Sequence, residues 1–142
     1  LGDAELIAYA TLSHWWLLSE LERPFHSARS DAEDAIRVFE ASGNERGLAR
    51  AWQVIASLEW DLGQAGKQLD ALEHAFDHAG RARASFETAE AFHSVTAAIV
   101  RGPIPVPDGI ARAEAILREF PDNRGAEAYM SHALAHLWAR LG

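Results

Sequence analysis

The seven histidines are the residues whose spacing most directly suggests chemistry. In two pairs, His74 with His78 and His132 with His136, the partners are four residues apart, so each pair would share one helix face, as two zinc ligands do. A catalytic zinc site needs a third protein ligand, and the HExxH pattern needs a glutamate that the segment from His132 to His136 lacks. We therefore predict that the chain holds no metal and no other cofactor.

Other residue types that could catalyse a reaction do not form a recognisable pattern. Ser13, His14 and Asp61 supply the groups of a hydrolase triad, but the GxSxG pattern of a nucleophile elbow is absent. Acidic residues such as Glu40 and Glu73 fall at helix starts and on polar faces rather than in pairs suited to acid–base catalysis. There is no cysteine to act as a nucleophile. We predict that the chain is not an enzyme.

Composition narrows the class of protein further. The chain has 142 residues, of which 49% are hydrophobic and 24% charged, as in a globular domain of ordinary size. Its net charge of -8 opposes binding to nucleic acid. No apolar run approaches the roughly 18 residues of a membrane span, and the first residues lack the layout of a signal peptide. We predict a cytoplasmic protein with neither nucleic-acid nor membrane partners, since the lack of cysteine fits that compartment.

Apolar residues with helical spacing predict an all-α chain. No stretch alternates apolar and polar residues as a strand would. Glycines that close a helix in the left-handed conformation are expected at Gly43, Gly63, Gly80 and Gly102. The predicted helices are seven and span 3–22, 30–42, 45–62, 65–79, 84–101, 107–119 and 124–141.

Several helix starts carry recognisable capping residues. Ser30 and Glu33 have the spacing of a capping box, and Asn44 and Asn123 are suitable N-caps. Pro107 falls in a first helical turn, where its missing N–H leaves no hydrogen bond unmade. The connections are mostly short, so consecutive helices should pack as antiparallel pairs.

The odd-numbered helices repeat with offsets of 39, 40 and 39 residues. Three columns of residues agree in this register: Ala10, Ala49, Ala89 and Ala128; Trp16, Ile55, Val95 and Leu134; Leu17, Ala56, Thr96 and Ala135. A period of this length indicates a solenoid in which each helix pair stacks on the next. The chain would then be one domain over 1–142 with three and a half repeats.

One helix pair resembles a tetratricopeptide repeat. The resemblance covers residues 49–75 and rests on Trp52, Ile55, Ala56, the turn at Gly63, and on Leu72 and Ala75. It implies a right-handed α-solenoid of antiparallel helix pairs. HEAT and armadillo arrays, whose period is nearer 40 residues, are the alternative class of helical repeat.

In tetratricopeptide folds, certain positions of the first helix of each pair point into a concave groove that binds peptides. The resemblance therefore implies a binding groove whose exposed aromatic anchor would be Trp60, although Trp60 could equally be a core residue. The predicted groove residues are His14, Arg50, Gln53, Ser57, Trp60, Asp61, Glu90, His93, Arg101, Tyr129, His132 and His136.

A longer resemblance covers roughly residues 32–120. The segments 35–40, 43–52 and 102–107 are similar to helical-repeat regions of large bacterial signalling proteins. Those regions follow an ATPase module that is often joined to a class III nucleotide cyclase or a DNA-binding domain. This chain has no GxxxxGK[ST] phosphate loop, so the resemblance implies a fragment of a longer protein.

The C-terminal helix would be a first helix without its second. A flank that carries Leu134, Leu137, Trp138 and Leu141 would then have no partner in the chain, unless this helix is a terminal cap. Such a flank could also form a homodimer.

The absence of a reactive pattern and the repeat together predict a binding protein. The leading interpretation is a non-catalytic scaffold that binds a peptide or a neighbouring domain in signal transduction or transcriptional regulation. The alternative is a small-ligand or metal-responsive sensor that uses the groove histidines.

Overall fold

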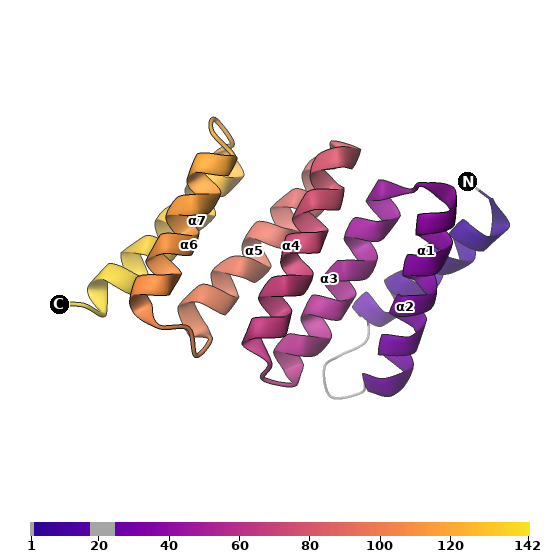
Figure 1. Cartoon of the computed structure of the whole chain (residues 1–142), viewed down its shortest axis with the longest axis horizontal. Helices are drawn as coiled ribbons and strands as arrows, with labels where there is room; N and C mark the ends of the chain where they lie inside the picture. Colours follow the sequence, from indigo (N-terminus) through magenta and orange to yellow (C-terminus); the bar gives the residue numbers. More distant parts are fainter. Residues whose placement is uncertain (1, 18–24) are drawn as a thin grey trace. The chain divides into compact units, whose positions relative to one another are not determined.

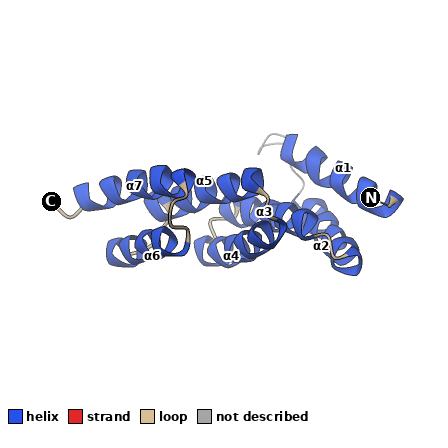
Figure 2. Cartoon of the chain, turned by 90° about the horizontal axis from the view of Figure 1, so that it is seen from above, coloured by secondary structure: helices blue, strands red, loops and turns tan. Residues whose placement is uncertain are grey.

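The computed structural model describes residues 2–17 and 25–142. Over these residues the chain forms helices and no strand, which confirms the all-α prediction (Figure 2). None of these helices combines the length and the apolar character that crossing a bilayer requires. The seven described helices are α1 (Asp3–Leu17), α2 (Phe25–Ser42), α3 (Glu45–Asp61), α4 (Ala65–Ala82), α5 (Ser85–Arg101), α6 (Val106–Glu119) and α7 (Arg124–Ala139) (Figure 1).

The predicted bounds of α3, α5, α6 and α7 are correct to within two residues. The Asn44 side-chain oxygen accepts a hydrogen bond from the Gly47 N–H at 2.9 Å, so the predicted cap of α3 is confirmed. Asn123 likewise caps α7. Gly43 and Gly63 have φ of 68° and 69°, as expected of residues that close a helix. The predicted continuation of the first helix to residue 22 lies outside the described residues.

The predicted capping box at Ser30 is wrong. Helix α2 begins five residues earlier, at Phe25, so Ser30 lies inside the helix. Ala28 and Ala32 are both fully buried on the same side of α2. Packing of this alanine face extends the helix past a local capping signal, because burial outweighs the preference of one serine for a helix end.

Gly80 and Gly102, which were also expected to close a helix in the left-handed conformation, do not do so. Helix α4 continues to Ala82, and Arg83 adopts the left-handed conformation with φ of 51°. Neither Gly80 nor Gly102 has a positive φ. Ala79 is fully buried one residue before Gly80, so α4 keeps its helical conformation through the site where the glycine could have ended it.

The chain divides into two compact units, Leu1–Thr88 and Ala89–Gly142. The first unit contains helices α1 to α4 and the first turn of α5. The second contains the remainder of α5 with α6 and α7.

Helix α3 is the centre of the first unit, where it packs against α1, α2 and α4. Small buried residues such as Ala49 and Ala75 let the helix backbones approach closely. Phe39 is fully buried against Gly47, where a Cβ atom would lie only 2.4 Å from the Phe39 ring. The core of this unit therefore combines small residues with a few large ones that fill the remaining space.

The second unit has its own core, formed by α6, α7 and the adjoining part of α5. A Cβ atom at Gly109 of α6 would lie 3.2 Å from both Ile99 and Leu137. Leu137 is fully buried, so the prediction that it lacks a partner is wrong. Trp138 and Leu141 remain exposed, with 59% and 62% of their surface accessible.

The repeat column of Trp16, Ile55, Val95 and Leu134 is not a uniform core column. Ile55 and Val95 are buried, but 48% of the Trp16 surface is exposed. Helix α1 instead buries Ala8, Leu12 and Trp15. Because neighbouring residues are about 100° apart on a helix, burial of Trp15 leaves Trp16 outside.

The two asparagine caps predict different losses of stability. We expect Asn123→Ala to lower the free energy of unfolding by about 1 kcal/mol, the usual contribution of an N-cap. Asn44→Ala should cost about 2 kcal/mol, because Asn44 also accepts a hydrogen bond from the Tyr9 hydroxyl and donates one to Glu5. Urea unfolding followed by circular dichroism measures both variants. Equal losses would show that the bonds to Tyr9 and Glu5 contribute nothing.

Candidate functional site

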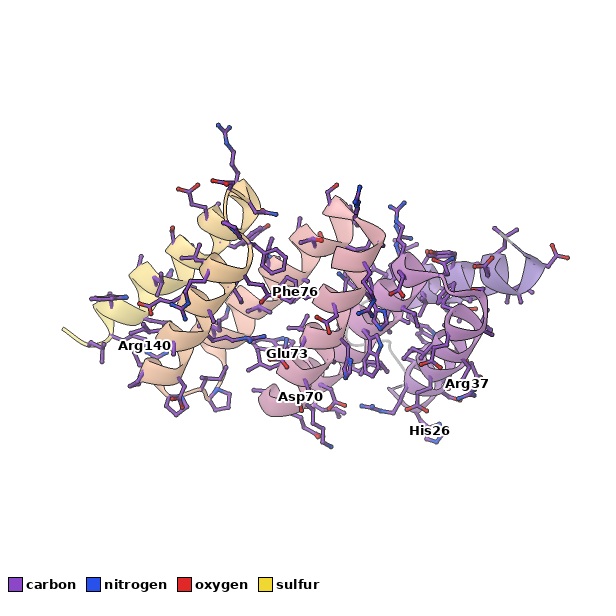
Figure 3. All side chains as sticks on the ribbon, turned by 45° about the horizontal axis from the view of Figure 1, so that its top comes forward. His26, Arg37, Asp70, Glu73, Phe76 and Arg140 are labelled. Atoms are coloured by element: carbon purple, nitrogen blue, oxygen red, sulfur yellow. The ribbon has the colours of Figure 1, made fainter. Side chains whose placement is uncertain are left out.

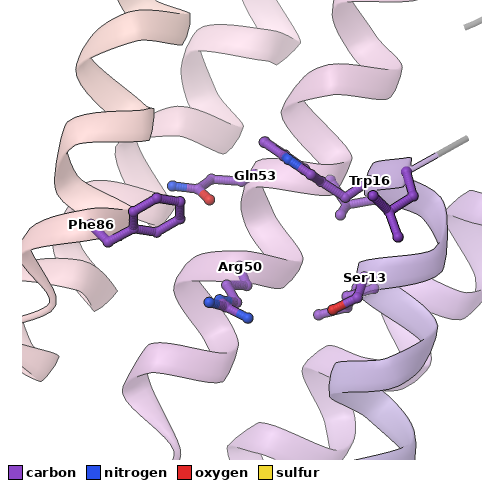
Figure 4. Close-up of a pocket in the computed structure, with 8 residues that line it drawn as sticks. Ser13, Trp16, Arg50, Gln53 and Phe86 are labelled. Carbon is purple, nitrogen blue, oxygen red and sulfur yellow. The ribbon is translucent and has the colours of Figure 1, made fainter. Parts of the chain in front are cut away.

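A pocket of about 290 Å³ lies in the first unit between α1, α3 and the first turn of α5 (Figure 4). We call it the α1–α3 pocket. Its lining is largely apolar with a few polar groups, which is typical of ligand and peptide sites. The lining residues are Leu12, Ser13, Trp16, Leu17, Arg50, Gln53, Val54 and Phe86.

Two aromatic residues form opposite walls of the α1–α3 pocket (Figure 4). Trp16 comes from α1 and Phe86 from α5, and about half of each side chain's surface is accessible. Trp16 faces outward because Trp15 is anchored inward, where its indole N–H donates to Asp31 at 2.9 Å. Leu17 adds a third apolar group with 84% of its surface exposed. Exposed large apolar residues gathered at one pocket are characteristic of an interaction site.

The polar groups of the α1–α3 pocket are held by Glu87. The Arg50 Nε–H donates to Glu87 Oε1 at 2.9 Å, and the Arg46 Nε–H donates to the same oxygen at 2.8 Å. The Gln53 side-chain amide donates to the Glu87 backbone carbonyl at 2.6 Å. The Arg50 guanidinium also lies 5.6 Å from the centre of the Tyr9 ring, within cation–π range. These contacts orient Arg50 and Gln53 before any ligand arrives.

Glu87 is fully buried, yet its pKa lies below the ordinary glutamate value. Burial raises the pKa of this carboxyl, but the hydrogen bonds from Arg46 and Arg50 and from its own backbone lower it by more. The carboxylate is therefore ionised near neutral pH. One anion beside two guanidiniums leaves a local positive charge at the pocket, although the chain as a whole carries a charge of -8.

Buried glutamates depart from the pattern expected of the acidic residues. Asp70 is exposed on α4, as predicted for a polar helix face, and Arg37 and His26 project outward from α2 (Figure 3). Glu59, in contrast, is buried, with its Oε1 atom accepting a hydrogen bond from Arg29 at 2.6 Å. The Oε2 atoms of Glu59 and Glu87 have no hydrogen-bond partner among the described residues.

A second pocket, of about 120 Å³, lies in the second unit between α5 and α7. We call it the histidine pocket. The His93 and Tyr129 rings meet edge to face with centroids 5.9 Å apart, and the Thr96 hydroxyl donates to the Tyr129 carbonyl at 3.4 Å. The His132 ring packs edge to face on His136 at 4.6 Å. The lining residues are His93, Thr96, Ala97, Val100, Arg101, Tyr129 and His132.

Half of the predicted groove residues line one of these pockets. Arg50 and Gln53 line the α1–α3 pocket. His93, Arg101, Tyr129 and His132 line the histidine pocket. The residues that line neither pocket are His14, Ser57, Trp60, Asp61, Glu90 and His136.

Trp60, the predicted aromatic anchor, is half-buried and lines neither pocket. His14 is exposed and packs edge to face on Trp15 with ring centroids 5.2 Å apart. Neither pocket supports the predicted role of Trp60 as an aromatic anchor. The aromatic residues of the α1–α3 pocket are Trp16 and Phe86.

His74 and His78, one of the two histidine pairs with the spacing of metal ligands, each contact another side chain. His74 stacks on the Trp52 ring with centroids 4.3 Å apart, and the His78 Nδ1 atom lies 2.6 Å from Glu45. The hydrogen bonds from His78 and then Arg81 hold the pKa of Glu45 below its ordinary value. Over residues 2–17 and 25–142, no three histidine, cysteine or acidic side chains are grouped in a way that could hold a metal ion.

Sequence reasoning missed Phe86 and Glu87 as site residues. Both lie in the first turn of α5, where an acidic residue is expected on account of the helix dipole alone. Their contribution comes from the contact of this turn with α3, which no local pattern reveals.

Comparison with protein-family models, with curated proteins and with solved structures found no match for this chain.

Proposed function

We propose that the chain is a non-catalytic binding domain that holds a short protein segment, or part of a neighbouring domain, in the α1–α3 pocket. The observation that carries the proposal is the pairing of exposed Trp16 and Phe86 across a pocket whose Arg50 is already positioned. Aromatic and arginine residues dominate the binding energy of protein interfaces. A segment with an apolar side chain beside an acidic group would match this lining.

We further propose that the helices form antiparallel pairs in a right-handed solenoid of the tetratricopeptide type. The repeat register supports this arrangement, since Ile55 and Val95 occupy one column and are both buried. The contacts of α3 with the helices on either side of it in the sequence are also those of stacked hairpins. In the bacterial signalling proteins that the sequence resembles, the partner would be another domain of the same cytoplasmic protein.

We also propose that the chain forms a homodimer through α7 and the residues that follow it. Trp138 and Leu141 are the exposed large apolar residues of the C-terminal segment, and they would form its interface.

The histidine pocket supports a second candidate function, that of a small-ligand sensor. Four predicted groove residues line it, and two of them are histidines, whose charge changes near neutral pH. Its volume of about 120 Å³ is well below that of a typical small-molecule site, so it would accommodate one group of a ligand rather than a whole molecule.

Removal of either aromatic wall should abolish most of the binding. We expect Trp16→Ala and Phe86→Ala each to weaken affinity about thirtyfold, the effect of losing an interface hot spot of about 2 kcal/mol. The probe is a short peptide enriched from a displayed random library on the whole 142-residue chain, with affinity measured by fluorescence polarisation.

Trp138→Ala is the control, because it removes an exposed tryptophan of α7 that does not line the α1–α3 pocket. It should leave the peptide affinity unchanged. Peptides that bind all three variants as tightly as the original chain would overturn the proposed site, and so would a library from which no peptide is enriched.

A further inference from the structure

The histidine pocket is lined by side chains with N–H groups that donate to no acceptor among the described residues. His93 and Arg101 come from α5, and His132 comes from α7. Among the described residues, none of these three side chains makes a hydrogen bond or an ion pair, although His93 and His132 have aromatic ring contacts. The Tyr129 hydroxyl is a further donor in the lining.

The lining of the histidine pocket contains no carboxylate. This is notable in a chain with 21 acidic and 13 basic residues. Arg140 adds a second cation nearby, because its guanidinium donates to the carbonyl of Val100, which lines the pocket, at 3.4 Å. The lining therefore carries positive charge without an acidic side chain, in a unit whose acidic and basic residues nearly balance.

One acidic residue opposes this charge. Glu90 precedes His93 by three residues and shares its face of α5. Glu90 is half-buried and does not line the pocket. The charged residues of α6 also do not line it, so Arg101 is the charged side chain of the lining, beside the His93 and His132 rings and the Tyr129 hydroxyl.

We propose that the histidine pocket binds a small oxyanion group, a carboxylate or a phosphate-type tetrahedral anion carried by a larger ligand. Several N–H donors on two helices can converge on such a group, and charge-assisted hydrogen bonds make that contact strong. The pocket volume suits one such group. This inference does not rest on the α1–α3 pocket, which lies in the other unit.

The test titrates the whole chain with sodium sulfate and, separately, with sodium acetate, while NMR follows the histidine ring resonances. We expect the ring resonances of His93 and His132 to shift at saturable anion concentrations and those of His26, on α2, to stay unchanged. Sulfate alone binding would assign a tetrahedral anion, and binding of both would extend the site to carboxylates.

Three variants sharpen the test. Arg101→Gln should weaken sulfate binding about tenfold, whereas Arg37→Gln, an exposed arginine on α2, should not change it. Glu90→Gln should strengthen binding, because it removes the one opposing charge on that face of α5. Equal shifts of all histidines, or a normal affinity in Arg101→Gln, would each overturn the proposal. None of these results bears on the peptide proposal, so the two can fail separately.

Discussion

Replacing Arg46 and Arg50 together with methionine is expected to lower the free energy of unfolding by about 3 kcal/mol. Both guanidiniums donate to Oε1 of Glu87, whose side chain is 1% exposed. Methionine retains much of the apolar stem but leaves the buried carboxylate without a cation. The loss falls at the low end for a broken buried pair, because the Arg46 side chain is 55% exposed and solvent screens its charge. Urea unfolding measures it.

A triple variant that also carries Glu87→Met is the control for this prediction. It should recover most of the lost stability, because no buried charge remains uncompensated. Arg37→Met provides the surface reference, since Arg37 pairs with Asp34 where both are exposed, and it should cost less than about 0.5 kcal/mol. A double variant no less stable than Arg37→Met would show that Glu87 does not depend on its arginines.

Acidification should narrow the difference between the double variant and the original chain. In the original chain the pKa of Glu87 lies below the ordinary value, so its ionised form stabilises the fold above the pKa of the unfolded state. That contribution is lost as the pH falls through the folded-state pKa. In the double variant, burial acts without the arginines and raises the pKa, so protonation relieves the strain of the buried charge. Unfolding curves at neutral and acidic pH test this sign.

Phe39→Ala is expected to cost about 4 kcal/mol, the usual loss when a fully buried phenylalanine leaves a cavity. The Phe39 ring packs 4.8 Å from the Tyr9 ring and against the backbone of Gly47. It thus joins α1, α2 and α3 at a single point. Thermal and urea unfolding of the variant measure the loss, and a change of less than about 2 kcal/mol would contradict it.

Gly47 makes this prediction sharper through a double-mutant cycle. Gly47→Ala alone should destabilise by about 1–3 kcal/mol, because its Cβ would lie 2.4 Å from the Phe39 ring. In the Phe39→Ala background the same methyl group enters the cavity, so the substitution should cost nothing or stabilise. Gly66→Ala is the matched control, since Gly66 lies in the first turn of α4 with open space at its Cβ. Equal effects of Gly47→Ala in both backgrounds would contradict the contact.

The helices could be predicted where their signals are local. Asn44 caps α3 and Asn123 caps α7. Gly43 and Gly63 are the left-handed residues that follow the ends of α2 and α3. The start of α2 could not be predicted in this way. Its early beginning depends on burial of Ala28, which is a contact with other helices rather than a property of the segment.

The candidate site was predictable only in part. The repeat register and the family resemblance together placed Arg50, Gln53, His93 and His132 in one groove, because residues at matching positions of repeated helices face the same way. In the structure, Arg50 and Gln53 line the α1–α3 pocket, whereas His93 and His132 line the histidine pocket. They did not predict Trp16 as a site residue. Trp16 reaches the pocket because α1 turns Trp15 inward, where Asp31 on α2 accepts its indole hydrogen bond.

The sequence by itself determined that this protein is all helical, where most of its helices begin and end, and which polar residues share a helix face. These properties follow from hydrogen bonding and side-chain periodicity within a single segment. Only the tertiary structure decided that Glu87 is buried between two arginines and that Phe86 and Trp16 form the walls of a pocket. Those features depend on which helices touch, and contacts between distant segments leave no local trace in the chain.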